Sequence, residues 1–263
     1  MLADLLKQEV TEGKVYDLGQ PYHPGMPHWP GGPPFALNVL KMHTDAVQSD
    51  GYAACVETYA TVSHLGTHID AIGHVSMHGK AFGGVPVAQR QKKTTGLEKL
   101  GIDESPPLLA RGVLVDVARL KNVDILPGGY EISSADFEAA VKMSGAAVRE
   151  GDAVFVRTGW SRHYSDAPRY LAEAAPGPGP EAARWLARKH VSLTGSDTPA
   201  YEKTPNNNFP AHVVLLVENG IHIVEWMNLE SLSEAGVSTF VSVIVPLRIV
   251  GASGSPVRPI GIR

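Results

Sequence analysis

Cysteine is almost absent from this sequence, because Cys55 is the one cysteine among 263 residues. A disulfide framework and a cysteine-rich zinc site are therefore both excluded. The chain also lacks a large excess of either charge, since 23 basic side chains stand against 27 acidic ones and the formal net charge is -4. This balance gives no electrostatic reason to expect nucleic acid or an anionic membrane surface as a partner.

Long apolar runs are missing as well. The longest lies near residues 241–245 and ends at Pro246, far short of the roughly 20 apolar residues that cross a bilayer. The first residues, MLADLLKQEV, lack the apolar core and the cleavage site of a signal peptide. We therefore expect no membrane partner and a cytoplasmic location.

Length and composition suit one globular domain with a substantial core, since 43% of the residues are hydrophobic. No internal repeat or long linker divides the chain, so residues 1–263 are predicted to form a single domain. Segments rich in proline and glycine are expected to be loops, and they lie at residues 19–34, 175–180 and 205–210.

Apolar and β-branched runs predict strands, several of them continuous enough to be covered on both faces. They lie at residues 54–62, 113–117, 153–158, 191–194, 221–225 and 237–250. Capping and turn residues predict helices at residues 134–144, 181–189 and 209–219. This order, with strand-rich ends and an alternating middle, predicts a mixed α/β fold with at least one sheet of mixed direction.

The stretch SHLGTHIDAIGH, residues 63–74, concentrates polar groups in an otherwise apolar context. His64, His68, Asp70 and His74 follow the spacing H-x3-H-x-D-x3-H. Neutral imidazole and carboxylate are ligands for zinc, manganese and iron(II). Burying four such groups without a metal or paired partners would cost several kcal/mol. A metal site is therefore favoured over the alternative, a solvated polar loop.

A straight strand would not let these side chains bind one ion. His64 and His68 would lie about 13 Å apart at 3.3 Å per residue, whereas metal–nitrogen bonds are about 2.0–2.1 Å long. The chain is therefore expected to bend at Gly66 and Thr67, because glycine tolerates unusual dihedral angles. We predict a strand up to about His64, followed by a bend or short helical turn that holds His68 and Asp70.

A second pair of candidate ligands lies far downstream. His212 begins the helix predicted at residues 209–219, and Glu225 ends the following strand. The two ends of this helix–Gly220–strand unit can meet, so both side chains are candidates for a second ion. His222 points to the opposite face of the predicted strand and is interpreted as structural.

Residues 64–74 resemble the H-x-G-T-H-x-D-x-P-x-H motif of the cyclase family of metal-dependent hydrolases, which includes kynurenine formamidase and isatin hydrolase. Here the motif reads HLGTHIDAIGH, with Ile72 at the position of the usual proline. Residues 212–225 are similar to the H-x2-L-L…G-I-x-I-x-E pattern of that family, and residues 195–199 to a segment near its active site. The resemblance spans nearly the whole chain.

The resemblance implies a swivelling β/β/α fold, a homodimer or homotetramer, and zinc or manganese as the divalent metal. It implies one ion on His64, His68 and Asp70, and a second ion on Asp70, His212 and Glu225. His74 would be the general acid/base. A site like that of isatin hydrolase, with a single manganese on the first three ligands, is the alternative. Because the second pair of ligands is present, two ions are favoured.

The predicted reaction is hydrolysis of an amide, imide or lactone bond in a small substrate. A bound divalent ion lowers the pKa of water towards 7 and polarises the substrate carbonyl. Trp29 and Tyr22 of the first proline-rich segment, together with Phe209, are candidates to contact an aromatic ring of the substrate. For the first two, a packed surface loop is the alternative.

Two readings from other classes remain open. A dioxygenase could use a two-histidine, one-carboxylate triad drawn from the same residues, and iron content and oxygen dependence would identify it. A non-enzymatic protein could hold a structural metal, which keeps no open coordination position.

Overall fold

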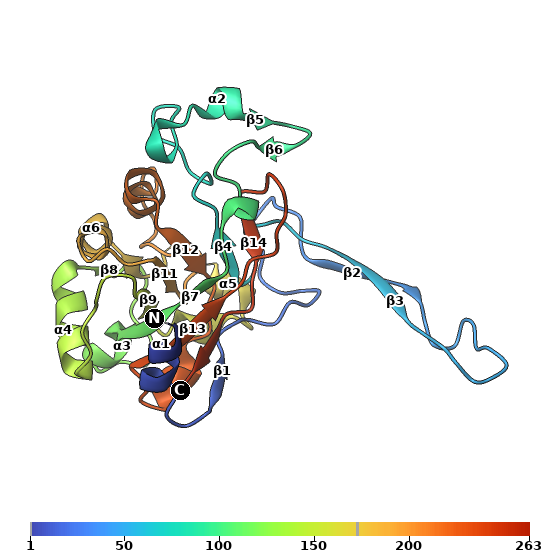
Figure 1. Cartoon of the computed structure of the whole chain (residues 1–263), viewed down its shortest axis with the longest axis horizontal. Helices are drawn as coiled ribbons and strands as arrows, with labels where there is room; N and C mark the ends of the chain where they lie inside the picture. The colour runs from blue at the N-terminus through green and yellow to red at the C-terminus, as the bar shows by residue number, and fades with distance from the viewer. Residues whose placement is uncertain (1, 172–173) are drawn as a thin grey trace.

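The computed structural model describes residues 2–171 and 174–263. Its largest sheet is built from β1 (Val15–Asp17), β4 (His68–Asp70), β7 (Leu108–Asp116), β9 (Ala153–Arg157), β11 (Leu193–Ser196), β12 (His222–Glu225), β13 (Thr239–Ile244), β14 (Gly254–Pro256) and β15 (Ile260–Ile262). From edge to edge these strands follow the order β1-β15-β13-β7-β9-β11-β12-β4-β14 (Figure 1). The four strands from β7 to β12 in this order run parallel, and the pairings outside them are antiparallel. The predicted mixed α/β fold with a sheet of mixed direction is confirmed.

Shorter elements surround this sheet. The α-helices are α1 (Leu2–Glu9), α2 (Val87–Arg90), α3 (Val117–Leu120), α4 (Ser134–Ser144), α5 (Ala167–Tyr170), α6 (Pro180–Arg188), α7 (Pro210–His212) and α8 (Glu230–Glu234). The 3-10 helices are η1 (Phe82–Gly84), η2 (Ile102–Glu104) and η3 (Trp160–His163), and η4 (Val213–Glu218) is a π-helix. The remaining strands are β2 (Ala36–Lys41), β3 (Val56–Ala60), β5 (Gln91–Lys92), β6 (Gly96–Leu97), β8 (Glu131–Ile132) and β10 (Gly177–Pro178).

The central strands are buried on both faces, which explains their continuous apolar sequences. Side chains alternate along β9, so Val154 and Val156 pack in one core with Phe137 of α4, while Phe155 packs in another. Phe155 stacks there on Phe240 of β13 at 5.6 Å between ring centroids. The sheet is therefore a rigid platform, and the loops at its strand ends can hold functional side chains.

Helix predictions agree closely with the structure because their signals are local. Ser133 and Asp136 form the capping box that starts α4, and Gly145 ends it in a left-handed conformation with φ of 70°. The helix expected at residues 181–189 is α6, shifted by one residue. The helix expected at residues 209–219 is formed by α7 and η4 in succession.

Strand predictions are less accurate at their ends. The run at residues 237–250 is a strand only over β13, because Pro246 cannot donate to a sheet. The run at residues 54–62 shortens to β3, and the predicted extension of this strand to about His64 is wrong. Ladder pairing with β2 stops at Ala60, and residues 61–67 form a turn instead.

The hairpin of β2 and β3 extends far from the rest of the molecule (Figure 1). We call residues 36–60, which comprise both strands and their connection, the arm. Its two strands pair with each other, and every residue of β3 is exposed. Large apolar side chains are exposed along it, namely Leu37, Val39, Leu40, Met42, Val47, Tyr52, Val56 and Tyr59. Within the described residues, no helix has the length and apolar character needed to span a membrane.

Candidate metal centre

The turn at residues 61–67 leads from the arm into β4, which lies next to the edge strand β14 of the large sheet. Gly66 has φ of +62°, and a Cβ atom there would lie 2.6 Å from the Tyr22 ring, so this position requires glycine. The Tyr22 hydroxyl lies 2.6 Å from the carbonyl oxygen of Leu65 and 2.7 Å from that of Thr67. The chain bends at Gly66, as the sequence predicted.

The sequence predicts a bend or a short helical turn that holds His68 and Asp70, and the structure has a bend at residues 65–67 followed by a strand, so the helical alternative is wrong. His68, Ile69 and Asp70 are β4, which pairs with β12 on one side and β14 on the other. This double pairing satisfies the backbone groups of a buried segment, which explains why a strand replaces the helical turn. Alternation along β4 places Ile69 in the core and turns His68 and Asp70 to the other face.

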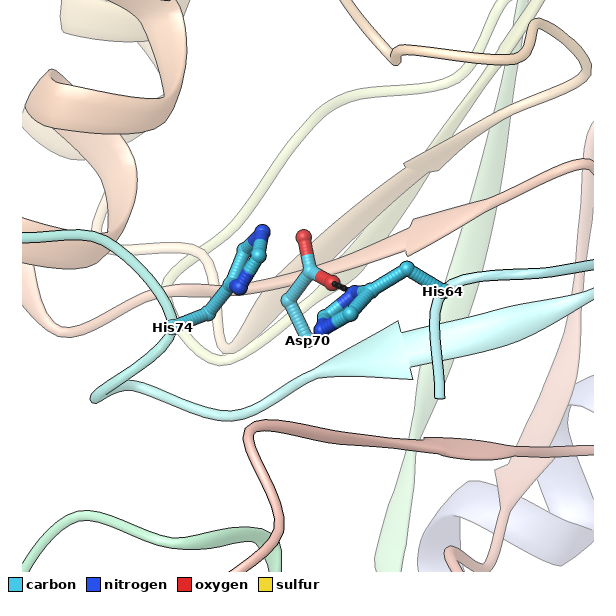
Figure 2. A group of neighbouring side chains, drawn as sticks. All are labelled: His64, Asp70 and His74. Carbon is cyan, nitrogen blue, oxygen red and sulfur yellow. Dashed lines mark hydrogen bonds and ion pairs between the residues drawn. The ribbon is translucent and has the colours of Figure 1, made fainter. Parts of the chain in front are cut away.

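Figure 2 shows His64, Asp70 and His74 gathered together, with a dashed line between His64 and Asp70. His64 Nδ1 lies 2.8 Å from Asp70 Oδ1, and His64 Nε2 lies 2.9 Å from Ser253 Oγ. The His64 and His74 rings stack at 3.9 Å between centroids. Ligand atoms of the three residues drawn lie within 4.8 Å of one another, so they can hold a metal ion together.

A second group shares Asp70 with the first. Ligand atoms of Asp70, His212 and Glu225 also lie within 4.8 Å of one another, and all three residues are buried. His212 Nε2 lies 3.1 Å from Glu225 Oε1 and 3.7 Å from Asp70 Oδ2. The helix–Gly220–strand unit thus brings His212 and Glu225 together as predicted. Asp70 stands between the two groups.

The structure does not group His68 with His64 in the way that the resemblance implies. Its Nε2 atom lies 3.5 Å from Asp70 Oδ1 and 3.5 Å from Glu225 Oε2, so it faces both carboxylates. The first group of the structure contains His64 with His74 and not with His68. His74, for which the resemblance implies a proton-transfer role, therefore also lies where a ligand would lie.

Polar atoms without hydrogen bonds gather between these side chains. His68 Nε2, Asp70 Oδ2 and Glu225 Oε1 are buried and find no hydrogen-bond partner among the described residues. His68 Nδ1 donates to the carbonyl oxygen of Gly66 at 2.8 Å, which leaves Nε2 with a free lone pair. Unsatisfied buried acceptors are costly, and this nitrogen and oxygen donor set fits a divalent cation.

Burial and mutual charge shift the pKa values of the cluster. Burial lowers the pKa of the His74 imidazole to about 4. Burial alone would raise the pKa of Asp70, but the His74, His64 and His68 imidazoles hold it well below its usual value. Burial, reinforced by the Asp70 charge, raises the pKa of Glu225. At neutral pH Asp70 is thus ionised and His74 is neutral.

A cavity of about 350 Å³ opens onto this cluster. It is lined by Trp29, His64, His74, Val75, Pro199, Ala200, Phe209, His212 and Glu225. Its volume falls within the range of small-molecule sites, and most of its lining is apolar. Two of the predicted substrate-contacting residues, Trp29 and Phe209, lie on its wall. The third, Tyr22, is not among the lining residues, because its hydroxyl is held by the backbone of the turn behind the cluster.

Sequence reasoning missed two residues of the site. Ser253 reaches His64 from the turn before β14, 189 positions away in the chain. Glu202 reaches His212 from the loop after β11. Neither belongs to a motif with recognisable spacing. The pairing of β14 with β4 brings Ser253 close to His64, whereas the fold of the loop between β11 and α7 brings Glu202 back to His212.

Comparison with known proteins places the chain in a family. Residues 16–203 match the model of the family described as "Putative cyclase". The chain belongs to this cyclase family. The resemblance drawn from residues 64–74 is therefore confirmed.

Two curated relatives cover most of the chain. Cyclase-like protein 1 of Arabidopsis thaliana is 27% identical over 265 residues, which is 98% of this chain and 89% of the relative. Kynurenine formamidase of Sphingopyxis alaskensis is 25% identical over 253 residues, which is 94% of this chain and 97% of the relative. Both alignments include the whole of the cluster and the cavity.

Solved structures extend this similarity to the fold. A crystal structure of a novel cyclase superposes with a TM-score of 0.90 at 27% identity, covering 98% of this chain and 91% of that one. Isatin hydrolase A from Ralstonia solanacearum superposes with a TM-score of 0.72 at 24% identity, covering 99% and 95%. At that identity the second likeness concerns the fold.

Proposed function

We propose that this cyclase-family chain is a metal-dependent hydrolase that cleaves an amide or cyclic amide bond, or a lactone, in a small substrate. The observation that carries the proposal is the set of buried, unpartnered nitrogen and oxygen atoms at the end of an apolar cavity. The name of the relative from Sphingopyxis alaskensis, kynurenine formamidase, supports an amide substrate.

The residues that would hold metal are the two groups that share Asp70. One ion would be held by His64, Asp70 and His68, whose Nε2 atom lies 3.5 Å from Asp70 Oδ1, with His74 left for proton transfer. The other ion would be held by Asp70, His212 and Glu225. A divalent ion bound there lowers the pKa of water and polarises a carbonyl group. We propose two ions per chain, zinc or manganese, because Asp70 belongs to both groups. A single manganese on the first three ligands is the alternative.

His74 is proposed as the general acid/base. Its neutral imidazole faces the cavity and can accept a proton and return it to the leaving group. Trp29 and Phe209, which also line the cavity, would orient a flat ring and exclude water from the reacting bond. Trp29 is braced edge-on against Trp226 at 6.0 Å between ring centroids.

Metal content and hydrolysis test this proposal together. Elemental mass spectrometry on gently purified protein should find one to two zinc or manganese ions per chain, with two expected. A panel of aryl formamides, cyclic imides and lactones should then show metal-dependent hydrolysis. Iron with oxygen-dependent turnover would indicate a dioxygenase instead. Metal that stabilises folding without any hydrolysis would indicate a structural site.

We also infer that the arm packs against a second copy of this chain, giving a homodimer or homotetramer. A two-stranded hairpin alone is marginally stable, and contiguous exposed apolar surface marks an interaction site. The same chain carries a second exposed apolar patch at Val245, Leu247, Ile249 and Val250. A cavity of about 250 Å³, lined in part by Phe35, Tyr59 and Leu247, joins this patch to the base of the arm. Arm and patch thus offer one chain both halves of a self-complementary contact.

Light scattering over a range of protein concentrations tests the assembly. The wild-type protein should have the mass of a dimer or larger, and replacing Leu37, Val39 and Leu40 together by serine should shift it towards the monomer. Val123→Ser, at an exposed apolar position on the body of the molecule, should leave the mass unchanged. A monomeric wild-type protein would contradict this inference, and binding of another protein or of lipid vesicles would identify a different occupant.

A further inference from the structure

Glu202 is a buried acid whose carboxylate makes all its hydrogen bonds to one short stretch of chain, residues 211–212. Its side chain is 2% exposed. Its Oε2 atom accepts from the Ala211 backbone N–H at 3.0 Å, and its Oε1 atom accepts from the His212 backbone N–H at 2.9 Å. The same Oε1 atom lies 2.7 Å from His212 Nδ1. The carboxylate therefore holds both the backbone and the imidazole of His212.

We propose that Glu202 is a positioning residue that fixes the tautomer and the orientation of His212 for metal binding. The inference rests on the proposed function, since it concerns one of the residues expected to hold the second ion. Glu202 itself does not point into the cavity, and its carboxylate oxygens are occupied by the three donors described above.

The hydrogen-bond geometry determines which nitrogen of His212 faces the metal cluster. A carboxylate accepts hydrogen bonds, so His212 Nδ1 is protonated and donates its hydrogen bond to Glu202. The other ring nitrogen, Nε2, is then left to face Glu225 and Asp70 at 3.1 and 3.7 Å. A carboxylate partner also makes an imidazole a stronger ligand, as expected of groups that support metal-binding histidines.

Glu202 also replaces a missing helix cap. Phe209 is the N-cap of α7, with φ of 46° and no side-chain hydrogen bond to the helix. The free N–H groups of the first turn are bonded to Glu202 instead. A purely structural role as a cap is therefore the competing explanation, and the test must separate it from positioning.

Glu202→Gln is the decisive variant. Glutamine has one oxygen and one NH₂ group, so it cannot accept at both of its terminal atoms. If its oxygen serves His212, its NH₂ group faces the Ala211 N–H. If it flips, the NH₂ group faces Nδ1 and favours the proton on Nε2. Glu202→Asp keeps the charge and both acceptors at a shorter reach. Glu218→Gln makes the same chemical change on an exposed residue of η4 and is the matched control.

Zinc affinity, measured by competition with a chromophoric chelator, should fall about 10- to 100-fold for the second ion in Glu202→Gln. Glu202→Asp should recover part of this loss, and Glu218→Gln should bind zinc like the wild type. Nitrogen-15 spectra of the zinc-loaded wild type should show His212 protonated at Nδ1, and the variant should lose this signal. In turnover, kcat should fall more than KM rises.

Lower thermal stability with unchanged zinc affinity would overturn the proposal and leave Glu202 as a helix cap. This result would not affect the proposed hydrolase. A wild-type protein that binds no divalent cation would instead contradict the proposed function, and the positioning role of Glu202 with it. Changed affinity in Glu218→Gln equal to that in Glu202→Gln would also overturn it, because a general charge effect would then explain both.

Discussion

The arm and the metal cluster are neighbours in sequence, but the arm exposes apolar side chains whereas the cluster buries ionisable ones. On the arm, Val39 is 60% exposed and Leu40 is 63% exposed, although both are aliphatic. In the cluster, His68 and Asp70 are 0% and 1% exposed, although both are ionisable. The difference lies in their neighbours, since β4 is paired on both sides whereas β2 and β3 pair with each other. Residue type alone does not determine burial here.

The largest effect should come from removing the shared carboxylate. Asp70→Asn should lower kcat/KM by at least about 10³-fold, because metal catalysis supplies several kcal/mol and each 1.36 kcal/mol is a factor of ten. Metal content should fall with it. Asp45→Asn makes the same change on the exposed arm and should leave kcat/KM and metal content unaltered. Equal losses in the two variants would show that the cluster has no special role.

Removing the His74 imidazole should separate proton transfer from metal binding. His74→Ala is expected to lower kcat by about 10²–10⁴-fold while the metal content is retained. His43→Ala, on the arm, should have no effect on either quantity. Loss of metal in His74→Ala would instead make His74 a ligand, in line with its place beside His64 and Asp70.

Stability should respond to the core side of β4 and not to the arm. Ile69→Ala removes a side chain that is 0% exposed and should lower the free energy of unfolding by about 2–5 kcal/mol. Urea denaturation at low protein concentration measures this change, with Val39→Ala as the matched aliphatic truncation on the arm. A cost for Val39→Ala as large as for Ile69→Ala would show that the arm is packed within a single chain.

The smallest effect is expected from a polar substitution on the arm. Leu40→Ser should change the free energy of unfolding by no more than about 0.5 kcal/mol at low protein concentration, because an exposed side chain loses few contacts. The effect should grow with protein concentration, since a second copy would then cover the arm. A cost that does not depend on concentration would contradict the proposed contact between copies.

Much of the fold follows from local signals. The helix at residues 134–144 is bounded by its capping box and its C-terminal glycine, both of which are readable in the sequence. The β-branched run at residues 153–158 becomes the buried strand β9. The cluster residues His64, Asp70, His74, His212 and Glu225 were all found from spacing and residue type, because metal ligands are a small chemical set.

The sequence by itself therefore determined which side chains gather in the candidate metal centre, what kind of fold holds them and where the chain must bend, at Gly66. Only the tertiary structure decided that His68 and Asp70 lie on a strand, that Glu202 supports His212, and that Tyr22 braces the turn outside the cavity. The strand depends on the pairing of β4 with β12 and β14, which lie far from it in the chain, and the other two features depend on contacts between side chains and distant or irregular segments. Local propensity and periodicity describe residues that are close in sequence, so they do not predict which distant segments pair or contact one another.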